Sequence, residues 1–400
     1  MSSPDNHPMN PSPIELNHRL TQLSSSLILV IASKARALRE AGVDVCGFGI
    51  GEPDFDTPQH IQEAAYAAMQ AGYTKYTASS GIPALREAIS EKFRKDNQLE
   101  YKPGQIIVST GAKQCCVTTM MAVCNEGDEV IIPSPYWVTY PEMVRIANAV
   151  PVFVQTTQEN AWKITPEQFE KAITPRTKLI IINTPGNPTG SVYTKEELRA
   201  IYQVAAAHNV LILSDEIYEK LVYEDAKHFS LASLCPEAYD LTITVNGFSK
   251  AYSMTGWRLG YMGAPERIAK VVDSIQSHMT ANACAFSQMG GLAALQGDQQ
   301  CVEDMRLEFD KRRKFMFERI SAIKGTKAVK PFGAFYILMD IQSYGLSSEE
   351  FSGRLLTEAN VVVAPGIAFG DDSVVRLSYA AGMPMIEKGL DRIEAFCAKL

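Results

Sequence analysis

The chain has 400 residues, of which 46% are hydrophobic and 21% charged, and its formal net charge is −7. This length exceeds what one hydrophobic core usually organises, so two packed lobes are expected. The modest acidic balance argues against a general nucleic-acid-binding protein and against attachment to an anionic membrane surface, because both depend on an excess of positive charge.

The N-terminal segment is polar and rich in proline, and residues 1–16 are expected to form a mobile tail. It lacks the basic start and apolar core of a secretion signal. The longest apolar runs, such as residues 27–32, are too short to span a membrane. None of the eight cysteines lies in a C-x-x-C pair or at zinc-ligand spacing. Reduced thiols, a cytoplasmic location and no metal site are therefore predicted.

Helical and strand patterns alternate from Pro58 onward. Thr57 is expected to cap a helix that starts at Pro58 and ends near Gly72. A second amphipathic helix is predicted over residues 82–95. Strands are predicted over residues 105–110, 129–132 and 150–154.

Three further strands are predicted at residues 178–183, 210–214 and 241–245, and the second of them is a nearly continuous apolar run. Between the first two, Thr194 and Glu197 form a capping box that opens a helix running to about residue 209. Strands this apolar, separated by helices, indicate a mainly parallel sheet covered on both faces.

The pattern changes from about residue 303. A long charged helix over residues 302–323 is followed by strands at 334–339 and 374–378, which is typical of a smaller α+β lobe. An N-terminal helix over residues 27–41 is expected to pack with this lobe. The predicted division is a tail (1–16), an N-terminal helix and segment of the small domain (17–57), a large domain (58–302) and a small C-terminal domain (303–400).

Polar residues gather at the predicted carboxyl ends of the strands, where open α/β sheets bind ligands. Asp215 follows the strand 210–214, with Tyr218 three residues on. In isolation Asp215 would more often be a helix cap; alternatively its carboxylate pairs with a cationic ring nitrogen. Lys250 ends the next strand. It is either a solvated surface lysine or, when burial lowers its pKa, an amine that forms a Schiff base with an aldehyde cofactor.

Two other segments could bind an anion. The turn Gly111-Ala112-Lys113 opens a helix, where backbone N–H groups and the helix dipole favour a phosphate, although such a turn alone is only weakly specific. Arg258 follows Lys250 by eight residues, and its guanidinium could hold a phosphate bidentately.

Two strand ends offer partners for a flat ring. Trp137 is at a position where tryptophan is more often core, but it could stack on such a ring. Asn187 lies in the turn 183–190, whose Pro and Gly content alone indicates only tight turns. Its side chain could donate a hydrogen bond to a ring oxygen.

Taken together, these segments resemble the fold type I pyridoxal-phosphate aminotransferases, most closely the bacterial I-gamma type of aspartate aminotransferase. The similar stretches occur in family order. They are Gly51-Glu-Pro-Asp-Phe-Asp-Thr-Pro58, Thr74-Lys-Tyr76, Gly111-Ala-Lys113, Pro135-Tyr-Trp137, Asn187-Pro-Thr-Gly190, Ser214-Asp-Glu-Ile-Tyr218, Ser249-Lys250, Thr255-Gly-Trp-Arg258, Gly333-Ala-Phe-Tyr336 and Arg376-Leu-Ser378.

The resemblance implies an α/β fold with a mainly parallel sheet between helices and a smaller α+β domain. It implies pyridoxal 5′-phosphate as cofactor, held covalently by Lys250, which would also move the proton during the reaction. Asp215 would keep the ring nitrogen protonated. Tyr218 and Asn187 would hydrogen-bond the ring oxygen, and Trp137 would stack on the ring.

The resemblance also implies the remaining site residues. Gly111, Ala112, Lys113, Ser249 and Arg258 would surround the cofactor phosphate. Tyr76 would reach the cofactor of a neighbouring subunit, which implies a homodimer with shared active sites. Arg376 would bind the substrate α-carboxylate fork to fork. The amino acid and 2-oxo acid substrates would also contact Gly51, Lys113, Trp137 and Asn187.

Two positions depart from the family pattern. Tyr140 stands where some members have a histidine that supports the aspartate, and Gly247 stands where some relatives have a phosphate-binding serine. Ser249 is a substitute if the turn aims it correctly. The six histidines match no catalytic position and are interpreted as surface or packing residues.

Substrate choice depends on fewer residues. Lys113 is associated in this type with the distal carboxylate of aspartate and glutamate, so the expected reaction is L-aspartate with 2-oxoglutarate, giving oxaloacetate and L-glutamate by a ping-pong route. Alternatives on the same scaffold are aminotransferases for prephenate, aromatic amino acids or alanine, and carbon–sulfur lyases. Ser24 lies where prephenate-using relatives have a lysine, which lowers the expectation of that activity.

Two further interpretations are weaker. A regulator that retains this fold would need a DNA-binding module, and only some 25 residues precede the first predicted long helix. A dinucleotide-binding motif at Gly47-x-Gly49-x-Gly51 fails, because Glu-Pro-Asp follows where a helix should start.

Overall fold

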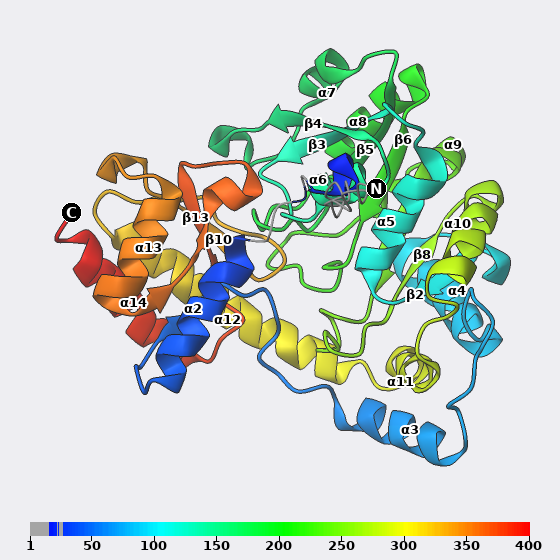
Figure 1. The fold of residues 1–400 in the computed structure, drawn as a ribbon, viewed down its shortest axis with the longest axis horizontal. Helices are drawn as coiled ribbons and strands as arrows, with labels where there is room; N and C mark the ends of the chain where they lie inside the picture. The colour runs from blue at the N-terminus through cyan, green and yellow to red at the C-terminus, as the bar shows by residue number, and fades with distance from the viewer. Residues whose placement is uncertain (1–15, 22, 24–26) are drawn as a thin grey trace, which may run out of the picture.

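The computed structural model describes residues 16–21, 23 and 27–400 (Figure 1). The predicted tail, apart from Leu16, therefore lies outside the described residues. So does Ser24, on which the expectation about prephenate rested. Among the described helices, none combines the length and the apolar character needed to cross a membrane.

The large sheet contains seven strands of the described chain, in the order β2-β8-β7-β6-β5-β3-β4. Strand β8 runs antiparallel to both of its neighbours, and the other pairings are parallel. The strands are β2 (Ile106–Ser109), β3 (Glu129–Ser134), β4 (Val150–Gln155), β5 (Thr177–Asn183), β6 (Leu211–Asp215), β7 (Thr242–Gly247) and β8 (Gly260–Gly263).

Helices cover both faces of the large sheet because its inner strands are apolar on both sides. On β5, Leu179 and Ile181 pack towards α5, α6 and α10, whereas Ile180 and Ile182 pack towards α7, α8 and α9. Helices α4 and α11 cover the β2 end. These helices are α4 (Pro83–Asn97), α5 (Ala112–Val123), α6 (Tyr140–Ile146), α7 (Pro166–Ala172), α8 (Lys195–His208), α9 (Pro236–Leu241), α10 (Glu266–Met279) and α11 (Ala285–Gln296).

A small antiparallel sheet, ordered β12-β13-β10-β9, packs with the C-terminal helices. The N-terminal segment joins this part through the parallel pair β1-β11. The long helix α12 runs from beneath the large sheet to the small one (Figure 1). These elements are β9 (Lys327–Ala328), β10 (Tyr336–Asp340), β12 (Ala364–Pro365), β13 (Val374–Ser378), β1 (Cys46–Gly47), β11 (Val361–Val362), α12 (Gln300–Ala322), α13 (Ser348–Ala359) and α14 (Met383–Cys397).

In the described chain, three α-helices precede α4: α1 (His18–Thr21), α2 (Leu27–Glu40) and α3 (Gln59–Gln70). Helix α2 lies beside the small sheet, and α3 lies at the opposite edge of the molecule, against α11 (Figure 1). The segment between them, residues 41–58, therefore crosses from one part of the structure to the other. This segment contains Gly49 and Gly51 and passes the carboxyl ends of the large-sheet strands.

The expected fold class is confirmed: a mainly parallel sheet lies between helices and is joined to a smaller α+β part. The capping box of Thr194 and Glu197 is also present at the start of α8. The expected cap at Thr57 is wrong, because Pro58 is the N-cap of α3 and makes no side-chain cap. The Thr57 hydroxyl instead donates to Ser253 O and accepts from Trp257 Nε1. The division into domains stays a prediction.

Candidate active site

A cavity of about 590 Å³ lies at the carboxyl ends of the large-sheet strands, with walls from the segment 50–52 and from β10 and β13 of the small sheet. Most of the predicted site residues meet there, although they are distant in sequence. Those that line the cavity are Gly51, Ala112, Lys113, Trp137, Asn187, Asp215, Tyr218, Ser249, Lys250, Arg258 and Arg376.

Lys250 follows β7 and extends into the cavity, where its Nζ donates a 2.7 Å hydrogen bond to the carbonyl oxygen of Gly51. The rings of Tyr218 and Phe335 lie 5.8 and 5.6 Å from Nζ. Burial lowers the pKa of the Lys250 amine to about 8, because the charged form loses hydration in this apolar setting. Lys250 is therefore an amine that loses its proton, and so becomes a nucleophile, close to neutral pH.

Asp215 ends β6, and its carboxylate is 4% exposed. Burial raises its pKa to about 6, although hydrogen bonds from the Tyr140 hydroxyl (2.6 Å) and the Ile217 backbone N–H (3.3 Å) oppose the rise. A buried carboxylate of this kind is stabilised by a cationic partner. Asp215 is therefore suited to a ligand that presents a positive group to this wall.

Tyr218 and Tyr336 join the two parts of the structure, with their hydroxyl oxygens 2.8 Å apart. Both side chains are buried, and burial raises the pKa of each. Tyr336 also limits the opposite wall, since a Cβ atom at Gly51 would overlap its hydroxyl. Glycine at position 51 thus leaves space that any side chain would fill.

Arg376, on β13, is 3% exposed and has an incomplete set of hydrogen bonds. Its Nη1 donates to Asn187 Oδ1 at 2.9 Å and its Nη2 to Gly49 O at 2.7 Å. Its buried Nε has no partner among the residues that the structure describes. The guanidinium lies 4.5 Å from the ring centre of Tyr336 and 4.7 Å from that of Phe369. A buried cation held in this way can bind a carboxylate with its planar donors.

The start of α5 has the geometry that suits an anion. Gly111 is the N-cap of α5 with φ of +83°, and a Cβ atom there would approach Arg258 Nη2 to 2.7 Å. Arg258 itself has φ of +51°, a strained value for arginine, and its Nη1 donates to Thr255 O at 2.6 Å. The free N–H groups at the start of α5 and the Arg258 guanidinium therefore face the same space.

Gly247, which departs from the family pattern, lies in a tightly packed position. A Cβ atom there would lie 3.0 Å from Gly260 Cα and 3.1 Å from Ile217 Cδ1. The strand pair β7-β8 thus leaves little room for a side chain at position 247. Ser249 does line the cavity, so its part in binding a phosphate stays a prediction.

Lys113 and Trp137 form the outer wall. The Lys113 Nζ lies 5.0 Å from the centre of the Trp137 ring and 3.5 Å from Thr139 Oγ1. Burial, followed by the charge of Arg258, lowers the pKa of Lys113. The exposed Lys113 therefore adds a positive group to the cavity lining that is separate from Arg376.

Two predicted site residues do not line this cavity. Gly111 contributes through the backbone beside Arg258, as described above. Tyr76 is 90% exposed. In the described part of the chain no histidine lines the cavity either, which agrees with their interpretation as surface or packing residues.

Sequence reasoning missed several residues of the cavity wall. Tyr336 was noted only as part of a motif, and its place at the start of a strand in the C-terminal region was the available signal. The cavity wall also includes Glu52, Thr139 and Asn183, which lie next to or close to residues of the family motifs. Glu52 contacts the Thr255 hydroxyl. No periodicity distinguishes them, because their position in the cavity depends on the tertiary fold.

The family model described as aminotransferase class I and II matches residues 43–393. An aspartate aminotransferase of Bacillus sp. (strain YM-2) is 50% identical over 95% of this chain and 98% of its own length. A probable aspartate/prephenate aminotransferase of Aquifex aeolicus is 48% identical, with 95% and 98% covered.

Solved structures show the same similarity. The aspartate aminotransferase from Rhizobium meliloti superposes with a TM-score of 0.93 at 38% identity, covering 97% of this chain and 100% of that one. The Thermus thermophilus aspartate aminotransferase with maleate has a TM-score of 0.92 at 43% identity, covering 96% and 99%.

Proposed function

The chain belongs to the class I and II aminotransferases, and on this premise we propose that it transfers the amino group of L-aspartate to 2-oxoglutarate, with pyridoxal 5′-phosphate as cofactor. The observation that carries the proposal is the buried amine of Lys250, whose pKa of about 8 makes it available to an aldehyde. Relatives at 46 to 50% identity bear the name aspartate aminotransferase, which supports the choice of substrate.

The residues of the cavity fit this cofactor on three sides. Arg258 and the start of α5 suit its phosphate, and the buried carboxylate of Asp215 suits a protonated ring nitrogen. Lys250 lies between these walls and the segment at Gly51, to which it donates its hydrogen bond. When bound, the cofactor supplies an electron sink for the carbon that exchanges its proton.

The chain's own residues would bind the substrate and move the proton. Arg376, whose buried Nε has no partner within the described ranges, would take the α-carboxylate, together with Asn187. Lys113 would attract the distal carboxylate of aspartate at the cavity mouth. The Nζ of Lys250 would receive and return the proton, which its lowered pKa allows near neutral pH. Trp137, Tyr218 and Asn187 would orient the cofactor.

A trapping experiment tests the proposal. Purified protein loaded with pyridoxal phosphate is reduced with borohydride and digested, and the modified peptide is identified by mass spectrometry. Attachment at Lys250, absent from Lys250→Ala, is the expected result. Attachment at another lysine, or none, would contradict the assignment. Aspartate and glutamate should each remove the visible absorption of the loaded protein before reduction.

Prephenate is a second candidate substrate, favoured by relatives named aspartate/prephenate aminotransferase at 45 to 48% identity. The same spectroscopic half-reaction separates the two. Protein converted to its aminated form by glutamate should regain its original absorption with oxaloacetate. Recovery with prephenate at a similar rate would widen the proposed activity.

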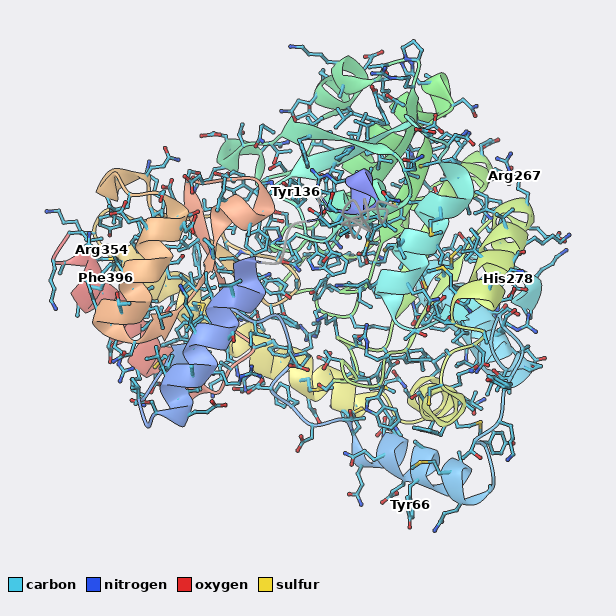
Figure 2. All side chains as sticks on the ribbon, in the orientation of Figure 1. Tyr66, Tyr136, Arg267, His278, Arg354 and Phe396 are labelled. Atoms are coloured by element: carbon cyan, nitrogen blue, oxygen red, sulfur yellow. The ribbon has the colours of Figure 1, made fainter. Side chains whose placement is uncertain are left out.

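The active unit is proposed to be a homodimer with shared active sites. Its support is a run of exposed aromatic residues on α3 and the turn after it: Tyr66, Tyr73 and Tyr76 are 60%, 44% and 90% exposed. Tyr66 points away from the rest of the protomer (Figure 2). Sedimentation of wild type and Tyr76→Ala, combined with activity after mixing Tyr76→Ala with Lys250→Ala, tests this. Recovery of activity in the mixture requires that the partner supplies Tyr76.

Two other proposals concern organisation and location. Residues 58–302 and 303–400, the latter with 17–57, would form the large and small domains. The eight unpaired cysteines support a reducing, cytoplasmic compartment. Limited proteolysis near residues 300–303 and cell fractionation test these proposals.

A further inference from the structure

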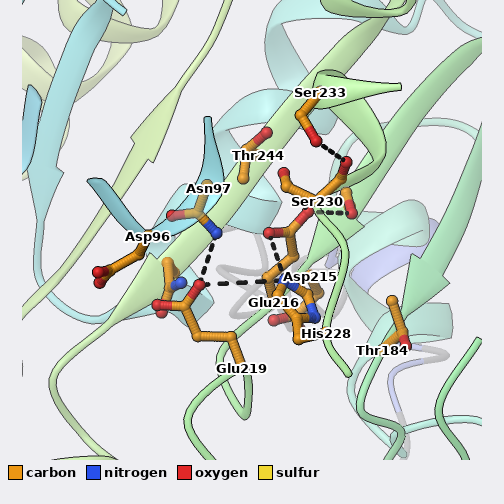
Figure 3. Close-up of polar contacts among 12 residues, drawn as sticks. Asp96, Asn97, Thr184, Asp215, Glu216, Glu219, His228, Ser230, Ser233 and Thr244 are labelled. Carbon is orange, nitrogen blue, oxygen red and sulfur yellow. Dashed lines mark hydrogen bonds and ion pairs between the residues drawn. The ribbon is translucent and has the colours of Figure 1, made fainter. Parts of the chain in front are cut away.

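Next to Asp215 lies a group of buried charged and polar residues outside the lining of the cavity, which we call the Glu216 cluster (Figure 3). It comprises Glu216 and Glu219 from the turn after β6, His228 from the following loop, and Lys92 and Asn97 from α4. The two carboxylates and Lys92 are buried, and the side chain of His228 is 9% exposed.

Glu216 is held by donors from three directions. The Ser214 and Ser230 hydroxyls donate to its Oε1 at 2.7 and 2.9 Å, and the His228 Nε2 lies 3.0 Å from its Oε2. Its backbone N–H donates to Val245 O on β7 at 2.9 Å. Both the side chain and the backbone of this residue are therefore fixed.

Glu219 connects the same turn to α4. Lys92 forms an ion pair with its Oε1, and Asn97 Nδ2 donates to its Oε2 at 2.7 Å. His228 Nε2 lies 3.9 Å from Oε2. Although burial alone would raise it, the charges of Lys92, His228 and Lys220 lower the pKa of Glu219 to about 2. The turn that follows Asp215 and contains Tyr218 is thus anchored at two residues, Glu216 and Glu219.

The ligand atoms of Glu216, Glu219 and His228 lie within 4.8 Å of one another, a spacing that suits a divalent cation. Here, however, each carboxylate oxygen already has a hydrogen-bonding or ionic partner from the chain, and the Lys92 ammonium supplies positive charge. The two carboxylates are therefore satisfied without an ion, although the buried Nδ1 of His228 has no partner among the described residues. The contacts of the cluster point to a role in holding the turn.

Asp215 and Glu216 are consecutive residues at a strand end, so their side chains point to opposite sides. The fixed orientation of Glu216 consequently sets the backbone direction at Asp215, the residue before it, and at Tyr218, two residues after it. We propose that His228, acting through Glu216, is a positioning residue that keeps Asp215 and Tyr218 aimed at the cofactor. This inference rests on the proposed function, because it assigns His228 a part in the same site.

The test compares His228→Ala with His228→Gln. Alanine removes the donor to Glu216, whereas the glutamine amide can place an N–H close to the position of Nε2. Ser230→Ala removes a second donor to the same carboxylate. Controls are His208→Ala, which breaks a 3.7 Å pair with Glu170 on the surface, and Ser233→Ala, which loses only a bond to the Ser230 carbonyl.

The readout is the pH midpoint of the visible absorption change of the cofactor-loaded protein, followed by kcat and KM for aspartate. His228→Ala should raise the midpoint by about one pH unit, since a misaligned Tyr218 stabilises the deprotonated lysine linkage less. It should lower kcat about tenfold with little change in KM. His228→Gln should restore most of the wild-type midpoint and most of the wild-type kcat. Ser230→Ala should raise the midpoint by less than His228→Ala does.

Three outcomes would overturn the inference. The first is a wild-type midpoint in His228→Ala despite a lower melting temperature, which is the mark of a merely structural residue. The second is an equal shift in His228→Gln and His228→Ala. The third applies if His228→Ala does not fold. In that case, a pH midpoint in Ser230→Ala equal to that in Ser233→Ala would contradict the inference. Wild-type protein that takes up no cofactor would instead refute the proposed function, so the two failures are distinguishable.

Discussion

The hydroxyl of Tyr140 donates a 2.6 Å hydrogen bond to Oδ2 of Asp215, and both side chains are buried. Tyr140 begins α6 and Asp215 ends β6, so the bond fixes a helix covering the large sheet to the strand that carries the acid. The phenol stays protonated at all working pH values, because burial and then the Asp215 charge raise its pKa well above 10. Asp215 therefore has a constant neutral donor.

Tyr140→Phe should weaken the hold of Asp215 on a cationic ring. Removing the donor raises the pKa of Asp215 above its value of about 6, so less of it is ionised at pH 7. A hydrogen bond to a charged group contributes about 1.5–3 kcal/mol, which corresponds to a loss in kcat of about tenfold or more. The acid limb of the kcat profile should move to higher pH. Tyr136→Phe, a change outside the cavity, should leave that limb in place.

The uptake of cofactor by apoprotein should accelerate with pH and level off above about 8. Only the deprotonated amine of Lys250 attacks an aldehyde, and burial lowers its pKa to about 8. About one molecule in ten then has a free amine at pH 7, compared with fewer than about one in a thousand for an ordinary lysine. Stopped-flow absorbance at a series of pH values measures this. A rate still rising at pH 10 would show that the amine titrates normally.

Arg376→Lys should raise KM for aspartate about 10- to 100-fold, because a single ammonium cannot reproduce the planar donors that face the substrate. It would also lose the fixed orientation given by Asn187 and Gly49. Steady-state kinetics provides the measurement. Arg354→Lys is the matched control, since Arg354 lies on α13 outside the cavity, where it pairs with Glu358 and lies 5.8 Å from the ring centre of Phe396 (Figure 2). Equal KM values for the two variants would remove Arg376 from substrate binding.

Lys113→Gln should reduce kcat/KM for aspartate and glutamate about tenfold, while slow reactions with alanine or phenylalanine remain unchanged. The reason is that only dicarboxylates gain from the positive charge beside Trp137 at the cavity mouth. Lys195→Gln, in the first turn of α8, controls for losing a lysine at a helix start. A uniform fall for all substrates would mean that Lys113 acts on the cofactor instead.

The strands and helices that could be predicted from the sequence are those with long apolar or amphipathic patterns. Strands β5, β6 and β7 fall within two residues of the apolar runs, and α12 within two residues of its predicted range. Strand β8 was missed because Gly260–Gly263 is short and has glycine at both ends. Its antiparallel place between β2 and β7 depends on long-range pairing that no local pattern records.

The sequence allowed the candidate site residues to be named, but it did not indicate most of the contacts between them. Asp215, Lys250 and Arg258 were identified from strand ends and from family resemblance. The bond between Tyr218 and Tyr336 joins residues 118 apart in sequence, and that between Lys250 and Gly51 joins residues 199 apart. Such pairs follow from the packing of the small sheet on the large one, which local sequence does not specify.

The bond from Arg376 to Gly49 spans 327 residues, almost the whole length of the chain. During translation, therefore, the large sheet can fold before the small-sheet wall of the cavity has been synthesised. A nascent chain has no Arg376 until β13 has left the ribosome, and Gly49 in the N-terminal segment lacks this hydrogen-bond donor until then. Chains released early would accordingly be inert towards substrate, even if their lysine were already in place.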